Sequence, residues 1–239
     1  MNYNQTIERM RELKLHGMAN ALENILTAKQ SAGLSTEQLL EILIQHESDL
    51  RHERKIDRLS KQARFRYQAE LSQIKANPAR NLDGQQLAAL STCKWIEKGE
   101  NLLITGPTGV GKSYLATALG NQACVNGFKV QYYNAQKLFY YLRLAKLDGT
   151  HRKLINGIAK VHLLIIDDFG MQKLDDMNRL DLMEIIEDRH AIKSTLMVSQ
   201  LPVSAWYEII AEPTLSDAIL DRLTSKANRI ELKGESLRR

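Results

Sequence analysis

The sequence predicts an α/β fold in which a mostly parallel β-sheet, covered by helices on both faces, follows a small all-helical N-terminal domain. From residue 85 onward, short apolar runs alternate with segments of helical periodicity, which is typical of parallel strands joined by helices. Before residue 66 the apolar residues recur mostly at three- and four-residue spacing, which indicates helices. A chain of 239 residues, 44% of them hydrophobic, can bury the core of such a protein.

The N-terminal helical domain is expected to span residues 1–66. Apolar residues over 6–30 predict two short amphipathic helices that are broken near Gly17. Ser35 precedes Gln38 by three residues, as in a capping box, so a long third helix is expected to begin there.

The third helix carries the excess charge of the chain. Residues 51–66 contain seven Lys or Arg and two acidic residues, an excess that equals the formal net charge of +5. Ile56, Leu59 and Ala63 share one side of this helix, and cations occupy the opposite side. A concentrated basic face attracts polyanions, because each neutralised phosphate releases counterions, so nucleic acid is the expected partner. The expected DNA contacts are Arg51, Arg54, Arg58 and Lys61, with a solvated surface or a protein-docking site as the alternative.

A linker is expected over 67–84, where turn formers such as Asn77, Pro78 and Gly84 are dense. The α/β domain then covers 85–239. Its expected helices are 87–96, 112–125, 135–147, 150–159, 176–191 and 215–227, and its expected strands are 101–105, 129–133, 161–166 and 195–199.

Residues 106–113, GPTGVGKS, match the phosphate-binding pattern G-x-x-x-x-G-K-[ST]. The loop follows an apolar run and opens a predicted helix, so backbone N–H groups and the positive end of that helix can face phosphate. Lys112 is expected to reach the β- and γ-phosphates of ATP, and Ser113 to ligate Mg²⁺. The predicted nucleotide-binding residues are Gly106, Pro107, Thr108, Gly109, Val110, Gly111, Lys112, Ser113 and Tyr114.

The apolar run 161–166 leads directly into Asp167 and Asp168. Two adjacent carboxylates at the end of a buried strand repel each other unless a cation or a proton relieves them, and Mg²⁺ is such a cation. Asp167 is therefore expected to help hold Mg²⁺. Asp168, next to it, is the candidate for the carboxylate that orients the attacking water, with capping of a turn before Gly170 as the alternative.

The predicted strand 195–199 ends in two polar residues, Ser199 and Gln200. A polar side chain there can hydrogen-bond the γ-phosphate or the attacking water and so sense the nucleotide, although ordinary strand-end turns use the same residues. Gln200 is the first candidate for this catalytic role, and Ser199 is the alternative.

Taken in this order, the motifs resemble those of AAA+ ATPases. More narrowly, residues 85–236 resemble the IstB-like helper ATPases of bacterial insertion sequences and the related DnaC-type helicase loaders. The stretches that carry the resemblance are CKWIEKGENLL at 93–103, LIIDDFG at 164–170, SQLP at 199–202, AILDRL at 218–223 and GES at 234–236. The stretch LKLHGMA at 13–19 is similar to IstB rather than to a helicase loader.

The resemblance implies an ATP-dependent homo-oligomer that binds double-stranded DNA and works with a cognate transposase in choosing or preparing the target. It also places Arg222 where such proteins carry an arginine finger, which reaches the γ-phosphate in the neighbouring subunit. A surface arginine on an amphipathic helix is the alternative. Asp168 replaces the glutamate that is common in AAA+ proteins, and the shorter side chain argues against fast hydrolysis, although an Asp-Asp pair is itself usual in the IstB-like subfamily.

Other functions share parts of this pattern. A helicase loader would differ in its partner, and a nucleotide-gated DNA-binding module would hydrolyse little ATP. A small-molecule kinase fits least, because no arginine-rich lid follows Asp167.

Residues 1–15 lack the apolar core of a signal peptide and no long uncharged apolar run occurs, so we expect a cytoplasmic protein with no membrane partner. Cys93 and Cys124 show no metal-ligand spacing.

Overall fold

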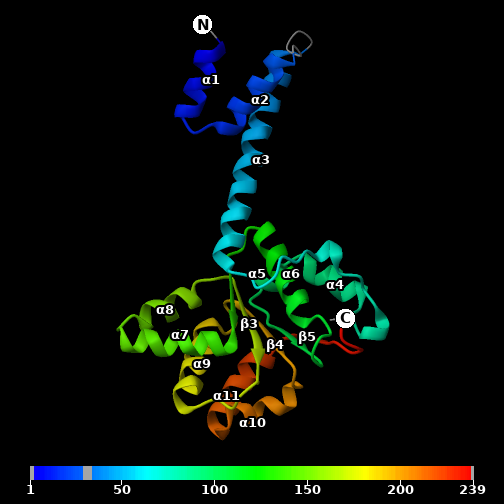
Figure 1. Cartoon of the computed structure of the whole chain (residues 1–239), viewed down its shortest axis with the longest axis vertical. Helices are drawn as coiled ribbons and strands as arrows, with labels where there is room; N and C mark the ends of the chain where they lie inside the picture. Colours follow the sequence, from blue (N-terminus) through cyan, green and yellow to red (C-terminus); the bar gives the residue numbers. More distant parts are fainter. Residues whose placement is uncertain (1–2, 29–33, 238–239) are drawn as a thin grey trace. The chain divides into compact units, whose positions relative to one another are not determined.

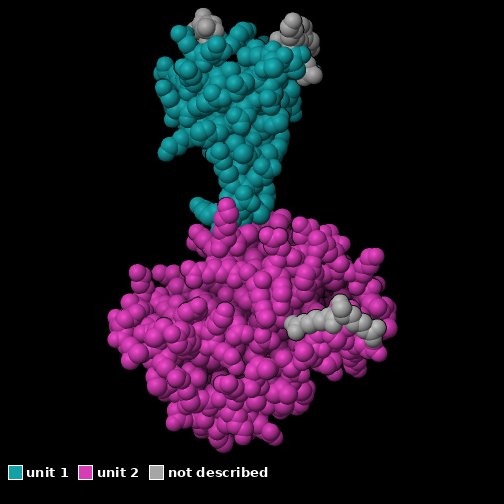
Figure 2. Space-filling model, viewed as in Figure 1, with its two compact units in different colours: residues 1–58 teal, residues 59–239 magenta. Residues whose placement is uncertain are grey.

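The computed structural model of the chain describes residues 3–28 and 34–237. It divides into two compact units, residues 1–58 and residues 59–239 (Figure 2). The division lies inside a long helix, α3 (Thr36–Ala63), and therefore ahead of the stretch 67–84 that the sequence suggested as a linker.

The boundary follows side-chain packing rather than the density of turn formers. Leu59 and Ala63, in the last turns of α3, are buried in the core of the second unit. The stretch 67–84 packs on the same unit, since Ala69 and Leu82 are buried and Asn81 Nδ2 donates to the carbonyl of Glu231 at 2.8 Å. It contains two short 3₁₀ helices, Leu71–Gln73 and Pro78–Arg80.

The first unit contains α1 (Tyr3–Glu12), α2 (His16–Thr27) and most of α3. The capping box is confirmed, because Gln38 N donates to Ser35 Oγ at 3.2 Å and Ser35 N donates to Gln38 Oε1 at 2.9 Å. The predicted end of the second helix near residue 30 lies outside the described residues.

The break between the first two helices lies at residues 13–15, near Gly17 as predicted, although Gly17 itself is in the first turn of α2. The chain turns at Lys14, whose φ is 61°. Gly17 serves close packing: a Cβ atom there would lie 2.4 Å from the carbonyl oxygen of His46 on α3. The glycine thus lets α2 approach the backbone of α3.

The second unit is built on a five-stranded sheet with the order β2-β3-β4-β1-β5, in which all neighbouring strands are parallel. The strands are β1 (Leu102–Thr105), β2 (Val130–Asn134), β3 (Leu163–Phe169), β4 (Ser194–Ser199) and β5 (Asn228–Glu231). Four of these match the predicted strands. The fifth was not predicted, because β5 is an edge strand in which only Ile230 is buried, so its apolar pattern is weak.

Helices cover both faces of the sheet (Figure 1). Leu102 and Ile104 of β1 belong to one core cluster and Leu103 to the other, as alternation along a strand requires. The first face packs against the end of α3 and against α4 (Gly84–Ser91), α5 (Lys94–Glu97) and α6 (Lys112–Val125). The second face packs against α7 (Ala135–Leu147), α8 (His151–Ala159), α9 (Asp176–Arg189), α10 (Trp206–Ile210) and α11 (Pro213–Thr224).

Two helical segments differ from the prediction. The expected helix 87–96 is two helices, because Cys93 has a left-handed backbone conformation with a φ of 58° between α4 and α5. The short helix α10 was not predicted, although its Trp206 is fully buried.

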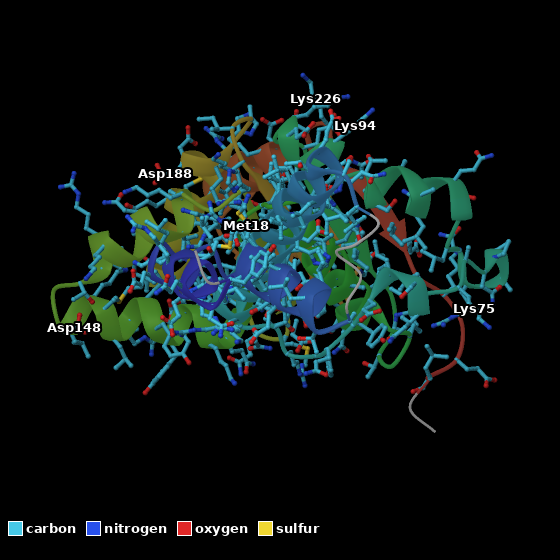
Figure 3. All side chains as sticks on the ribbon, turned by 90° about the horizontal axis from the view of Figure 1, so that it is seen from above. Met18, Lys75, Lys94, Asp148, Asp188 and Lys226 are labelled. Carbon is cyan, nitrogen blue, oxygen red and sulfur yellow. The ribbon has the colours of Figure 1, made fainter. Side chains whose placement is uncertain are left out.

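Charged side chains such as Lys75, Asp148 and Lys226 point outward (Figure 3). No helix among the described residues is long and apolar enough to cross a membrane.

The packing of α6 gives a stability prediction. A Cβ atom at Gly120 would lie 2.6 Å from Phe65 Cε1 and 2.8 Å from Ile165 Cδ1, so Gly120→Ala should destabilise the second unit by about 1–3 kcal/mol through overpacking. A Cβ atom at Gly157 on α8 would meet no other atom within 4 Å, so Gly157→Ala should stabilise by about 0.5–1 kcal/mol. Urea unfolding monitored by the fluorescence of the buried Trp95 and Trp206 measures both changes. Equal effects of the two substitutions would contradict the packing argument.

Candidate nucleotide site

The loop 106–111 joins the end of β1 to the first residue of α6. Gly106 and Gly109 have φ values of 141° and 83°, and a Cβ atom at either would lie 2.2 Å from another atom, Leu232 O or Ser236 Oγ respectively. Only glycine fits both the backbone conformation and the space. The loop therefore wraps tightly before the N-terminus of α6, where the first backbone N–H groups of a helix lack helical acceptors.

A cavity of about 350 Å³ opens beside this loop. It is lined by Tyr67, Thr108, Gly109, Gly111, Lys112, Ser113, Tyr114, Asp168, Gln200 and Leu237. The structure thus brings most of the predicted nucleotide-binding residues together with Asp168 and Gln200. The C-terminal segment also reaches the loop, since Leu237 N donates to the carbonyl of Gly109 at 2.9 Å. Sequence reasoning had assigned no role to Tyr67 or Leu237.

Pro107 and Val110 do not line the cavity, but contacts made by them and by Lys112 and Tyr114 hold the loop in place. Pro107 accepts a hydrogen bond from Lys112 Nζ at 2.8 Å, and the Lys112 side chain is largely enclosed, with the residue 7% exposed. Val110 is buried, and its carbonyl accepts from the guanidinium of Arg80. Tyr114 donates its hydroxyl to Gln73. These contacts hold the loop on the sheet and on the segment that precedes β1.

Asp167 is fully buried and does not itself line the cavity, but it contacts Ser113, which does. Alternation along β3 places it on the same face as Leu163 and Ile165, which is the face that α6 covers. Ser113 Oγ donates to Asp167 Oδ1 at 3.0 Å, and the hydroxyl of Tyr132 donates to Oδ2. Burial raises the pKa of Asp167 above its ordinary value, while these hydrogen bonds oppose the change.

The Ser113 hydroxyl and the Asp167 carboxylate together fit Mg²⁺. Both are hard oxygen donors, they lie 3.0 Å apart, and Ser113 faces the cavity. Magnesium is usually bound through one or two such protein oxygens and phosphate. A cation there would also relieve the electrostatic cost of the buried carboxylate.

Asp168 occupies a β-bulge. The pairing of β3 with β4 shifts between Ile166 and Phe169, and Asp168 has a φ of 59°. Such strained residues recur at functional sites. The bulge turns the Asp168 side chain to the cavity, where it is 27% exposed, and its Oδ2 accepts from Asn134 Nδ2 at 3.0 Å and from Arg66 Nη1 at 3.3 Å.

Sequence reasoning missed these partners of the two carboxylates. The local sequence pattern assigns no such contact to Tyr132, Asn134 or Arg66. Asn134 ends β2 in register with Asp167, so a polar residue at the end of the neighbouring strand was a usable signal. For Arg66 the only signal was its positive charge.

The two sensor candidates have different surroundings. Ser199 is buried, donates to the carbonyl of Phe169 at 2.7 Å and accepts from Leu201 N at 3.1 Å. Gln200 lines the cavity, and its Oε1 accepts from Thr108 Oγ1 at 2.6 Å. Of the two, only Gln200 faces the space beside the loop.

Arg222 is not among the residues that line this cavity. It lies on α11, where it forms an ion pair with Glu187 of α9 and donates from Nη1 to the carbonyl of Ala218 at 3.0 Å. The structure therefore does not bring Arg222 to the nucleotide site of its own chain.

The four predicted DNA contacts also differ among themselves. Arg51 Nε lies 2.7 Å from Glu47 Oε1, and the other carboxylate oxygen of Glu47 accepts from the backbone N of Gly17 at 2.7 Å. Arg51 thus supports the contact of α2 with α3. Arg54, Arg58 and Lys61 are exposed, and within the described residues they take part in no ion pair.

Another group of metal-ligating side chains consists of His151, Asp181 and Glu184, whose ligand atoms lie within 4.8 Å of one another. Lys146 Nζ lies 2.6 Å from Asp181 Oδ1 and already supplies a positive charge to this group. The cluster is therefore an ion-pair network between α7, α8 and α9.

Comparison with known proteins identifies the family. The family model described as IstB-like ATP binding protein matches residues 8–239. An insertion sequence ATP-binding protein of Sinorhizobium fredii (strain NBRC 101917 / NGR234) is 43% identical over 234 residues, covering 98% of this chain and 96% of the relative. An IS1162 ATP-binding protein of Pseudomonas fluorescens is 40% identical over 200 residues, covering 83% of this chain and 87% of the relative.

Solved structures share the fold. The structure of DnaI aligns with a TM-score of 0.60 and 21% identity, covering 70% of this chain and 92% of that chain. The DnaC helicase loader aligns with a TM-score of 0.59 and 19% identity, covering 69% of this chain and 97% of that chain. The chain belongs to the IstB-like ATP-binding protein family, and its second unit has the AAA+ P-loop fold.

Proposed function

We propose that this protein is a Mg²⁺-dependent ATPase that acts as a homo-oligomer on double-stranded DNA and helps a cognate transposase to select or prepare its target. The observation that carries the proposal is that the phosphate loop, Ser113 and Asp168 line one cavity, with the buried Asp167 hydrogen-bonded to Ser113. An ATPase assay with and without duplex DNA, combined with sizing in the presence of ATP, tests it as a whole.

In this mechanism the loop residues bind the phosphates, and Lys112 contacts the β- and γ-phosphates. Ser113 and Asp167 would hold Mg²⁺, which would supply charge neutralisation at the phosphate oxygens. Asp168 orients the attacking water, because its side chain reaches the cavity from the bulge in β3. Gln200 is proposed as the side chain that responds to the γ-phosphate, since it faces the same cavity.

Arg222 is proposed to act on the nucleotide of a neighbouring subunit. Its place on α11, paired with Glu187 and away from its own cavity, agrees with a role in trans. Hydrolysis would then depend on assembly, because each site needs an arginine from another chain.

The basic side of α3 is proposed as the DNA-binding surface of the N-terminal region, residues 1–66. Arg54, Arg58 and Lys61 are exposed cations on one helix, and spaced cations of this kind suit contacts with the phosphate backbone. Arg51 contributes charge while it holds Glu47. We place the protein in the cytoplasm, where its DNA lies.

A helicase loader remains the alternative partner assignment. The likeness to DnaC and DnaI is at about 20% identity and supports the fold alone. Relatives at 43% and 40% identity carry insertion-sequence names, which favours a transposase. Pull-down experiments with a transposase and with a replicative helicase distinguish the two. A nucleotide-gated DNA-binding module would bind ATP and DNA but show almost no turnover.

Lys112→Ala should lower ATP turnover by about 10²-fold or more, because the charge that meets the phosphates is lost while the loop remains. Steady-state phosphate release and nucleotide binding measure the change. Lys98→Ala, which removes an exposed lysine between α5 and β1, should behave like the parent protein. Unchanged turnover in Lys112→Ala would remove the loop from the mechanism.

Arg222→Ala should leave ATP binding by an isolated subunit nearly intact but lower turnover in the assembly by about 10³-fold or more. Mixing it with Lys112→Ala protein should restore some turnover, where an intact loop meets an intact Arg222. Glu187→Gln is the matched control, because it breaks the same ion pair and keeps the arginine. If Glu187→Gln loses as much activity as Arg222→Ala, the arginine acts through α9 and has no role in trans.

Replacing Arg54 and Arg58 with alanine should weaken binding to unrelated duplexes by similar factors. The slope of log affinity against log salt should flatten by about one to two units, on the order of 0.9 per lost phosphate contact. ATP binding should persist, because both residues lie in the first compact unit and the loop lies in the second. The double replacement of Lys94 and Lys98, two exposed lysines elsewhere, controls for net charge. Identical slopes in parent and Arg54/Arg58 variant would exclude α3 as a DNA contact.

A further inference from the structure

The side chain of Arg66 contacts the residue that the proposed function places beside the attacking water. Arg66 Nη1 lies 3.3 Å from Asp168 Oδ2, and Asn134 Nδ2 donates to the same oxygen at 3.0 Å. One carboxylate oxygen is therefore bound by two donors before any substrate arrives. A carboxylate held in this way has less capacity to accept a hydrogen bond from water.

The ion pair is accessible to competing anions. The side chains of Arg66 and Asp168 are 48% and 27% exposed, and ion pairs with this degree of exposure are weak. The guanidinium carbon of Arg66 lies 5.2 Å from the ring centroid of Tyr67, and Tyr67 lines the nucleotide cavity. Arg66 therefore contacts two residues that line the cavity, Tyr67 and Asp168, while about half of its own side chain is exposed to solvent.

Arg66 also follows the basic helix directly along the chain. Arg64 has a left-handed backbone conformation, with a φ of 57°, just after α3 ends at Ala63. Lys61, Arg64 and Arg66 are all exposed and belong to the second compact unit. A guanidinium can bind phosphate with two parallel hydrogen bonds, so phosphate competes well with the single contact to Asp168.

We propose that Arg66 is a positioning residue that restrains Asp168 until a phosphate of duplex DNA replaces the carboxylate on its guanidinium. This inference rests on the proposed function, because it needs Asp168 to act on water and DNA to bind at the basic end of α3. Without DNA, Arg66 and Asn134 both hold Asp168. In the DNA complex Arg66 pairs with phosphate, and Asp168 keeps only Asn134. One side chain thereby couples DNA binding to hydrolysis.

The coupling is reciprocal, so it can be measured as DNA affinity in nucleotide-free protein. Asp168→Asn removes the charge that holds Arg66, and duplex DNA should bind this variant about twofold to fivefold more tightly, the range that an exposed ion pair supports. Arg66→Gln should bind DNA more weakly and lower the salt slope by about 0.9. In the Arg66→Gln background, Asp168→Asn should have no further effect.

Asp217→Asn controls for the loss of one negative charge, because Asp217 is an exposed carboxylate on α11. It should bind DNA like the parent protein. An equal gain from Asp168→Asn with and without Arg66 would overturn the proposal, since the gain would then not pass through the arginine. This arm involves no hydrolysis, so it can fail while the ATPase assignment stands.

The second arm measures turnover. Arg66→Gln should raise DNA-free turnover by about twofold to fivefold and bring the ratio of turnover with DNA to turnover without DNA toward one. Arg66→Lys keeps the charge and should restore both values toward those of the parent. An equal fall in turnover with and without DNA, not rescued by lysine, would indicate a structural role and overturn the proposal. If Lys112→Ala hydrolyses ATP as fast as the parent protein, the proposed function fails. The DNA-affinity measurements still test the contact between Arg66 and Asp168 in that case, because they involve no hydrolysis.

Discussion

The fully buried carboxylate of Asp167 is the constraint on which the site depends. A charge without solvent needs donors or a cation, and here Ser113, Tyr132 and the backbone N of Asp168 surround it. These groups come from α6, β2 and the bulge in β3. A parallel sheet satisfies the need because β2 and β3 run side by side in the same direction, so the Tyr132 hydroxyl of β2 reaches the carboxylate near the end of β3.

The same constraint explains the position of the phosphate loop. β1 lies two strands from β3, with β4 between them. The loop leaves β1, and α6 then packs across the sheet face that carries Leu163, Ile165 and Asp167. The first turn of α6 is thereby brought to the carboxyl end of β3, where Ser113 meets Asp167 at 3.0 Å. The apolar core on this face thus fixes a polar contact between segments 54 residues apart.

Local motifs predicted the loop, the Asp-Asp strand end and four of the five strands, because each is encoded in a short stretch of sequence. The contacts that complete the site join distant segments, as Arg66 and Asp168 do across 102 residues, and a single sequence gives no register for them. β5 was missed because an edge strand buries little apolar surface. The local pattern located the helix break near Gly17, but it could not show that Gly17 itself packs against the backbone of α3, because that contact joins distant segments.

Two arginines are proposed to act on groups that lie outside the single chain. Within the single chain, each of them forms an ion pair with a carboxylate. Arg66 pairs with Asp168 and Arg222 pairs with Glu187. At least one partner in each pair is more than a quarter exposed, so each pair is weak enough for a phosphate or a neighbouring site to displace it. An isolated subunit would then keep its catalytic carboxylate restrained and its finger withdrawn. Under the proposed function, assembly on DNA would remove both restraints together and would confine hydrolysis to the assembled complex.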